Sequence, residues 1–357
     1  MSNETLLNQT ASPGSESSES QTGAGDGSRA LGTFAIILLV VAVLRLVIGM
    51  VSIPVSLVAP VSVIVSVVFV GAPILGLFSA ARYPWSFKRA LIFLVVGVAI
   101  WYGSYVGAMH VAEPMIGGLL IALSQSGLIV WCFAIGSLLA LVLKDKNLIL
   151  PIAVFLALFD MWLVFAPEGL VQRSVVQGQA ETLRAVAYQV PEVRATSAGG
   201  RAAAMLYVGP ADYLFISMFF VALYRFRMRT VRTLKVIVPV LGVYLLTVLL
   251  FSGVHVGPIS LGALPALLPI GLVVLIVNRD QFNLNRDEKL VTWFIAIAGT
   301  AFITWRILQP LPPPQVETLP SSDDSEWIRH YRLPGIEGPS RPLSGSGYAP
   351  GSTPGLP

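Results

Sequence analysis

Two aspartates, Asp160 and Asp212, are the residues whose type and setting point most directly to chemistry. They stand in the segments LALFDMWLVF and YVGPADYLFISMFF, where almost every neighbouring side chain is apolar. An Asp at the centre of a membrane-spanning helix costs roughly 2.5–3.5 kcal/mol on insertion scales, so such residues are rare and usually functional. Two carboxylates in contact in such a setting cannot both ionise, so one of them keeps a proton.

A carboxylate pair that shares a proton is suited to the hydrolysis of a peptide bond. The ionised member deprotonates a water held between the two, and the protonated member polarises the scissile carbonyl. The same pair would also suit a transporter coupled to protons or cations, and from the two residues alone that is the more frequent use. Two separate Asp side chains can also simply hydrogen-bond between helices.

Long apolar segments must position these residues. The chain has 357 residues, of which 55% are hydrophobic and 12% charged, and its mean hydropathy is +0.77. A soluble domain carries about 25% charged residues. The sequence therefore predicts an all-α, polytopic transmembrane helix bundle of about nine spans, each long enough to cross a bilayer. The predicted spans are 31–51, 57–80, 89–109, 115–142, 148–166, 204–224, 233–252, 260–277 and 290–308.

Composition divides the chain into tails, helices and loops. Residues 1–30 are rich in Ser, Gly, Glu and Thr and are expected to form a disordered N-terminal tail. The Pro/Gly/Ser-rich residues 309–357 are expected to form a second one. Between them, 31–147 hold the N-terminal transmembrane helices, 148–277 hold both aspartates and the loop 167–203, and 278–308 hold the last loop and helix. We expect a multi-pass integral membrane protein in contact with membrane lipids, in the cell membrane if its source is prokaryotic.

Charge and cysteine content argue against several classes of partner. The net charge of +4 is too small to indicate a nucleic-acid partner. The single cysteine, Cys132, lies in an apolar run, and the three histidines lie far apart. The sequence therefore predicts no intrachain disulfide and no Cys-rich metal site, and we expect neither a metal nor a cofactor.

Basic residues gather in alternate loops, of which the richest is Arg225–Lys235. These loops share one face if every predicted span crosses, and by the positive-inside rule that face is cytoplasmic. The helix of Asp160 then runs outward and the helix of Asp212 returns. At a rise of 1.5 Å per residue, both aspartates lie roughly 10–12 Å below the same outer face, so they can meet.

A proline lies on the same outer side. The segment LGALPALLPIG places Pro265 near the outer end of the eighth predicted span. Pro lacks an N–H and disfavours a continuous helix. In hydrocarbon the freed backbone is tolerated only where it faces protein or a water-filled cavity. Two other polar residues lie inside predicted spans: Arg45, expected to pair with a polar group or to reach an interface, and Gln125, expected to be a helix–helix contact.

Three short motifs surround these residues, and they stand as Phe159-Asp160, Gly209-Pro210-Ala211-Asp212 and Pro265-Ala266-Leu267. In this order they resemble the Tyr-Asp, Gly-x-Gly-Asp and Pro-Ala-Leu motifs of the presenilin and signal peptide peptidase families of intramembrane aspartyl proteases. The resemblance covers residues 148–277 and is closer to the signal peptide peptidase branch. It implies a presenilin-like core within the helix bundle.

The resemblance implies an enzyme, an intramembrane aspartic endopeptidase that hydrolyses transmembrane helices or signal peptides. Asp160 and Asp212 would be its catalytic pair, and a segment such as Ala185–Val193 would supply an edge strand for the unwound substrate. Phe159 departs from the pattern by replacing a Tyr and Ala211 by replacing a Gly, which leaves an inactive relative that binds transmembrane segments as an alternative. The residues implied to shape the substrate site are Phe159, Gly209, Pro210, Ala211, Pro265, Ala266 and Leu267.

Overall fold

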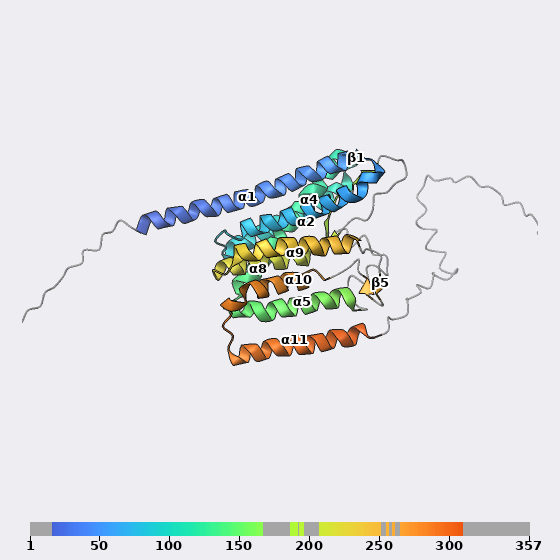
Figure 1. Cartoon of the computed structure of the whole chain (residues 1–357). Helices are drawn as coiled ribbons and strands as arrows, with labels where there is room; N and C mark the ends of the chain where they lie inside the picture. The colour runs from blue at the N-terminus through green and yellow to red at the C-terminus, as the bar shows by residue number, and fades with distance from the viewer. Residues whose placement is uncertain are drawn as a thin grey trace, which may run out of the picture. The chain divides into compact units, whose positions relative to one another are not determined.

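The computed structural model describes residues 16–166, 186–191, 193–195, 207–250, 255–256, 259–260 and 265–309. These residues belong to one compact unit, Met1–Leu311, and form an all-α helix bundle (Figure 1). Its α-helices are α1 (Glu16–Met50), α2 (Val55–Ala80), α3 (Phe87–His110), α4 (Pro114–Val142), α5 (Ile149–Phe165), α8 (Pro210–Arg225), α9 (Thr230–Leu250), α10 (Leu267–Asn278) and α11 (Arg286–Ile307), with short 3₁₀ turns η1 (Lys146–Leu148) and η2 (Arg279–Gln281).

A helix occupies each predicted span. In the described part of the chain, seven helices are long and apolar enough to cross a membrane, which indicates a multi-pass membrane protein and confirms the predicted all-α bundle. The two that fall short are α8, with 16 residues, and α10, with 12. At the other end of the chain, α1 begins at Glu16, so helix replaces the predicted disordered tail from that residue onward. A helix that is already nucleated extends at little cost, which accounts for the difference.

Both short helices begin later than hydropathy predicted. α8 begins at Pro210 rather than at 204, because Pro is favoured at the first helical position and Gly209 precedes it as the N-cap. α10 begins at Leu267 rather than at 260, directly after Pro265 and Ala266. Asp212 is therefore the third residue of its helix instead of lying deep inside it.

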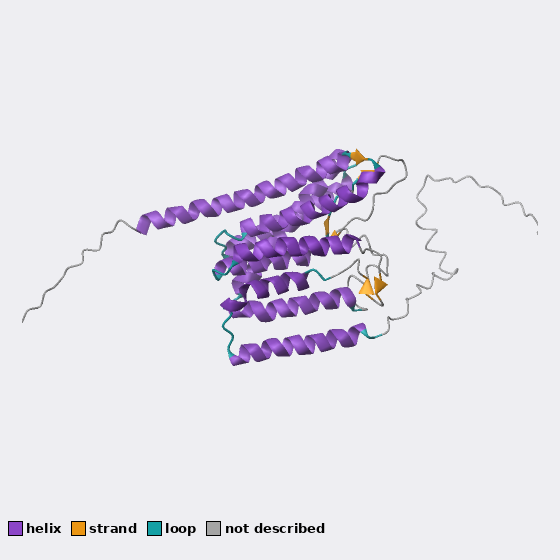
Figure 2. Cartoon of the chain, viewed as in Figure 1, coloured by secondary structure: helices purple, strands orange, loops and turns teal. Residues whose placement is uncertain are grey.

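Short strand pairs gather at one end of the bundle (Figure 2). β1 (Ser52–Ile53) pairs in parallel with β3 (Arg194–Ala195), and β5 (His255–Val256) pairs with β6 (Ile259–Ser260). β2 (Tyr188–Gln189) lies inside the segment Ala185–Val193 that was expected to supply a strand, and it pairs antiparallel with β4 (Tyr207–Val208). The rest of the predicted loop 167–203, residues 1–15 of the N-terminal tail and residues 310–357 of the C-terminal tail lie outside the described residues.

The basic loops lie together at the opposite end of the bundle. Arg225, the last residue of α8, donates from Nη1 to three carbonyls where α4 ends, at 2.8–2.9 Å. Arg82, which follows α2, donates from Nε to the hydroxyl of Tyr224 at 3.0 Å. Asn147 of η1 donates to the carbonyl of Asn283, which precedes α11, at 2.9 Å. These contacts confirm that the predicted basic loops share one face.

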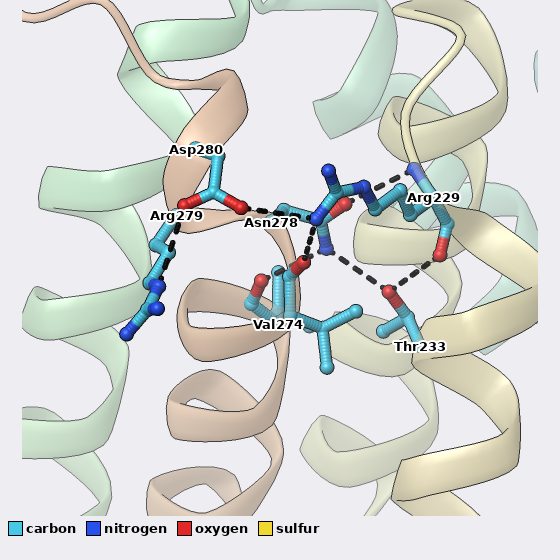
Figure 3. Close-up of polar contacts among 7 residues, drawn as sticks. Arg229, Thr233, Val274, Asn278, Arg279 and Asp280 are labelled. Carbon is cyan, nitrogen blue, oxygen red and sulfur yellow. Dashed lines mark hydrogen bonds and ion pairs between the residues drawn. The ribbon is translucent and has the colours of Figure 1, made fainter.

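The same end joins α9 to α10 through a buried amide (Figure 3). Asn278 is fully buried, and its Nδ2 donates to the Thr233 hydroxyl at 3.0 Å and to the Val274 carbonyl at 2.9 Å. Its Oδ1 accepts from the backbone N–H of Arg229 at 3.0 Å, whose guanidinium reaches Asp280 at 3.2 Å. The C-terminal end of α10 is thus fixed against α9, which leaves its N-terminal end to meet α5.

Candidate active site

Asp160 accepts a hydrogen bond from the start of α10. The backbone N–H of Leu267 lies 2.7 Å from Asp160 Oδ2. Leu267 is the first residue of the helix, where an N–H has no partner within the helix, and a helix N-terminus favours a negative charge. Pro265 is buried beside it and Ala266 is the N-cap. The Pro-Ala-Leu segment and the first aspartate are therefore in direct contact.

Asp212 lies at the start of α8, next to Gly209. The N-cap is Gly209 and Pro210 is the first helical residue, so Asp212 sits in the first turn, where the helix dipole also favours a carboxylate. The backbone N–H of Asp212 donates to the Gly209 carbonyl at 3.2 Å. A Cβ added to Gly209 would lie 3.6 Å from Asp212 Oδ2, so the two residues are in contact.

The two carboxylates are close enough to interact electrostatically. Both side chains are half-buried, and each lies at the end of its helix that faces away from the basic loops. Asp160 is about 7 Å before the end of α5 at a helical rise of 1.5 Å per residue. The structure therefore brings Asp160, Asp212 and Leu267 together; depth had predicted that the two aspartates can meet, and the resemblance had implied Leu267.

Tyr244 of α9 is a site residue that the sequence did not single out. It interacts electrostatically with both Asp160 and Asp212, and it packs half-buried against the core. The sequence did hold a signal for it. In the run VPVLGVYLLTV, which lies between the second aspartate and Pro265, Tyr244 is the one residue before Thr247 with a polar side-chain group.

Phe159 lies along the side of α5. Its ring stacks on Phe155 at 6.0 Å and packs against Trp162 at 5.8 Å between centroids. All three rings line an apolar groove of about 290 Å³ between α5 and α11. The other lining residues are Leu158, Ile295, Gly299, Phe302 and Ile303. The residue before the first aspartate therefore contributes to a groove on the surface of the bundle.

Helix α4 holds α8 at close range. A Cβ on Gly136 of α4 would lie 2.3 Å from the carbonyl oxygen of Leu214, so the two backbones touch, as small residues allow in membrane helix pairs. Nearer the site, the Cys132 thiol donates to the Pro210 carbonyl at 3.3 Å. Ala211 is half-buried between Pro210 and Asp212. The first turn of α8 is thus fixed from the α4 side.

Comparison with known proteins finds no relative of the chain. No protein-family model, no curated protein and no solved structure matches the chain.

Proposed function

We propose that the chain is an intramembrane aspartyl endopeptidase with Asp160 and Asp212 as its catalytic pair. The observation that carries the proposal is the 2.7 Å hydrogen bond from Leu267 to Asp160, made beside an Asp212 within electrostatic reach. Three motifs that resemble those of presenilins and signal peptide peptidases, far apart in sequence, thereby meet at one end of the bundle. We accordingly interpret residues 148–277 as a presenilin-like core, with α8 and α10 as shortened spans.

The pair would hydrolyse a peptide bond with water alone. One carboxylate takes a proton from the water while the other, protonated, donates to the scissile carbonyl. The new C–O bond gives a tetrahedral diol, whose C–N bond then breaks as a proton passes to the departing amine. The N–H of Leu267 holds the Asp160 carboxylate in place during these steps. The shared proton belongs to the pair rather than to either residue.

Substrates would be transmembrane helices or signal peptides, unwound at the cleavage point. An extended segment in an apolar setting must find partners for its backbone, and strand addition supplies them. β4 ends at Val208, immediately before Gly209 and close to Asp212, which favours it as the receiving strand. The groove beside Phe159 would hold apolar side chains of the substrate or lipid. With the basic loops in the cytoplasm, the substrate's amino terminus lies there too.

The test is cleavage of a fluorogenic transmembrane peptide by the purified full-length protein in detergent. Asp160→Asn and Asp212→Asn should each abolish cleavage, and a transition-state-analogue inhibitor of aspartyl proteases should block it. Asp280→Asn is the matched control, because that carboxylate lies at the opposite end in an exposed ion pair. Cleavage that survives in either active-site variant would refute the proposal.

If the unmodified protein does not cleave the peptide, binding and flux measurements distinguish the remaining functions. Inhibitor binding that depends on both aspartates would indicate a competent site presented with the wrong peptide. Peptide binding without cleavage or inhibitor binding would favour an inactive relative, for which Phe159 and Ala211 are the reason. Proton-dependent substrate flux in vesicles, insensitive to the inhibitor, would favour a transporter.

A further inference from the structure

Arg45 is a buried charge that the proposed reaction does not use. It lies in the apolar run of α1 and is 8% exposed. Such a residue is expensive inside a membrane unless its polar atoms are bound. The salt bridges among the described residues join other side chains; Arg45 instead donates from Nη2 to the backbone carbonyl of Gln189. Its guanidinium also lies over the ring of Tyr188, 5.3 Å from the centroid.

Gln125 of α4 binds the other polar group of the same peptide unit. It is 5% exposed, and its Oε1 accepts from the backbone N–H of Gln189 at 2.9 Å. Gln189 therefore has both its carbonyl and its N–H bound by side chains from α1 and α4. A buried carbonyl and N–H at the edge of a strand need partners, so the two side chains act in the place of a neighbouring strand. We call Arg45 and Gln125 the strand clamp.

The strand clamp acts on the β2–β4 pair from the side away from β4. In an antiparallel pair, successive residues direct their N–H and carbonyl groups alternately toward and away from the partner strand. Gln189 stands opposite Tyr207 and Tyr188 opposite Val208. Since the clamp binds the groups of Gln189, the groups of Tyr188 are the ones directed at β4. The clamp thus fixes which residues of β2 face β4.

Two links carry this constraint to Asp212. β4 runs directly into Gly209, the N-cap of α8. In addition, the ring of Tyr188 packs edge-to-face on that of Tyr213, the neighbour of Asp212, at 5.3 Å. Both tyrosines are 1% exposed, so neither ring has room to move independently. A shift of β2 would therefore displace the backbone and the neighbouring side chain of Asp212.

We propose that Arg45 and Gln125 are positioning residues that set the register of the β2–β4 pair beside Asp212. The first and fourth helices, which lie outside the segment that resembles a protease, then determine where along a substrate the bond is cut. This second statement rests on the proposed function, whereas the effect of the clamp on β2 and β4 does not.

The pairing can be measured without any cleavage assay. Cysteines replacing Gln189 and Tyr207 would stand directly opposite each other in the antiparallel pair, where Cα atoms are close enough for a disulfide. The clamp binds the backbone of Gln189, so a cysteine at this position keeps the groups that the clamp contacts. The native Cys132 is fully buried. Variants that carry only one of the two new cysteines show whether Cys132 takes part in the cross-link. The readout is the rate of cross-linking in the full chain under mild oxidation.

Arg45→Met and Gln125→Leu should each slow the cross-link by roughly ten-fold, as expected for the loss of one hydrogen bond to a buried backbone group. Arg45→Lys and Gln125→Glu keep a donor and an acceptor, and should recover most of the rate. Ser126→Ala is the matched control, because the Ser126 hydroxyl bonds only within its own helix, to the Ala122 carbonyl at 3.0 Å. Equal rates in the parent, Arg45→Met and Gln125→Leu would overturn the clamp.

Mass spectrometry of the cleavage products then tests the second statement. In Arg45→Met and Gln125→Leu the cut should spread to neighbouring bonds and KM should rise, while Ser126→Ala and Arg45→Lys keep the parent pattern. An unchanged product pattern with a slowed cross-link would overturn the effect on register and leave the clamp standing. A clamp-dependent cross-link in a protein that cleaves nothing would count against the proposed function instead.

Discussion

Replacement of Gly136 by Ala is the sharpest test of how α8 is held. The added Cβ would lie 2.3 Å from the Leu214 carbonyl oxygen and 2.8 Å from the Met218 nitrogen. Both atoms belong to the backbone, so no side chain can rotate to make room. Contacts of this kind need about 3.5 Å, so α4 and α8 must separate by roughly 1 Å. Overpacking a tight interface costs about 1–3 kcal/mol, against an intrinsic helix gain of about 1 kcal/mol from Gly to Ala.

We therefore expect Gly136→Ala to lower the free energy of unfolding by up to about 2 kcal/mol and to reduce cleavage, because α8 carries Asp212. The assay is thermal unfolding in detergent followed by tryptophan fluorescence, beside peptide cleavage. Gly103→Ala in α3 is the matched control, since nothing lies within 4 Å of the Cβ it would gain; it should keep or raise the midpoint temperature. If both variants unfold at the same temperature, α4 and α8 are not in backbone contact and the account of α8 is wrong.

Three other substitutions test separate features by thermal unfolding or cleavage. Asn278→Ala should lower the free energy of unfolding by about 2–3 kcal/mol, because the Arg229 N–H loses its acceptor. Asp280→Asn removes an exposed ion pair and should lower it by less than about 1 kcal/mol. Equal losses in the two variants would contradict the buried junction of α9 and α10. Arg227, exposed in the α8–α9 turn, has a left-handed φ of 53°. Arg227→Gly should therefore raise the free energy of unfolding by about 0.5–1 kcal/mol. A lower midpoint temperature in this variant would show that residue 227 is not left-handed. Pro265→Ala should leave stability unchanged or raised but reduce cleavage, because α10 can then extend and engage the Leu267 N–H internally; full activity would show that the bond to Asp160 is dispensable.

Helix positions were predictable because an apolar run long enough to span a membrane has few alternatives. The predicted spans 57–80 and 115–142 fall within a few residues of α2 and α4. The starts of α8 and α10 were misjudged for a common reason. Hydropathy continues through Tyr207–Val208 and up to Pro265, yet local stereochemistry decides where a helix begins, and Gly209-Pro210 and Pro265 are stronger signals than apolarity.

The site was predictable in outline and not in its contacts. Asp160 and Asp212 could be paired because both are carboxylates in apolar surroundings at one depth. The donor to Asp160 could not be named, since a backbone N–H carries no mark in the sequence and Leu267 lies 107 positions away. Arg45 was expected to find a polar partner, but that partner is a carbonyl 144 positions along the chain. Tyr244 could not be assigned to the site, because the sequence does not show which face of α9 turns toward the pair.

The two misjudged helix starts are also what makes the site possible. A helix continuous from 260 would have engaged the Leu267 N–H with its own upstream carbonyl, and no donor would remain for Asp160. Likewise, a helix continuous from 204 would have placed Asp212 mid-helix, without the N-terminal dipole that favours its charge. In an apolar bundle, a helix start left without partners is costly. Here each start lies beside a carboxylate, so each helix start and its aspartate stabilise one another. Replacing both aspartates by Leu should therefore lower the midpoint of thermal unfolding, because the Leu267 N–H then lacks its acceptor; an unchanged or higher midpoint would refute this coupling.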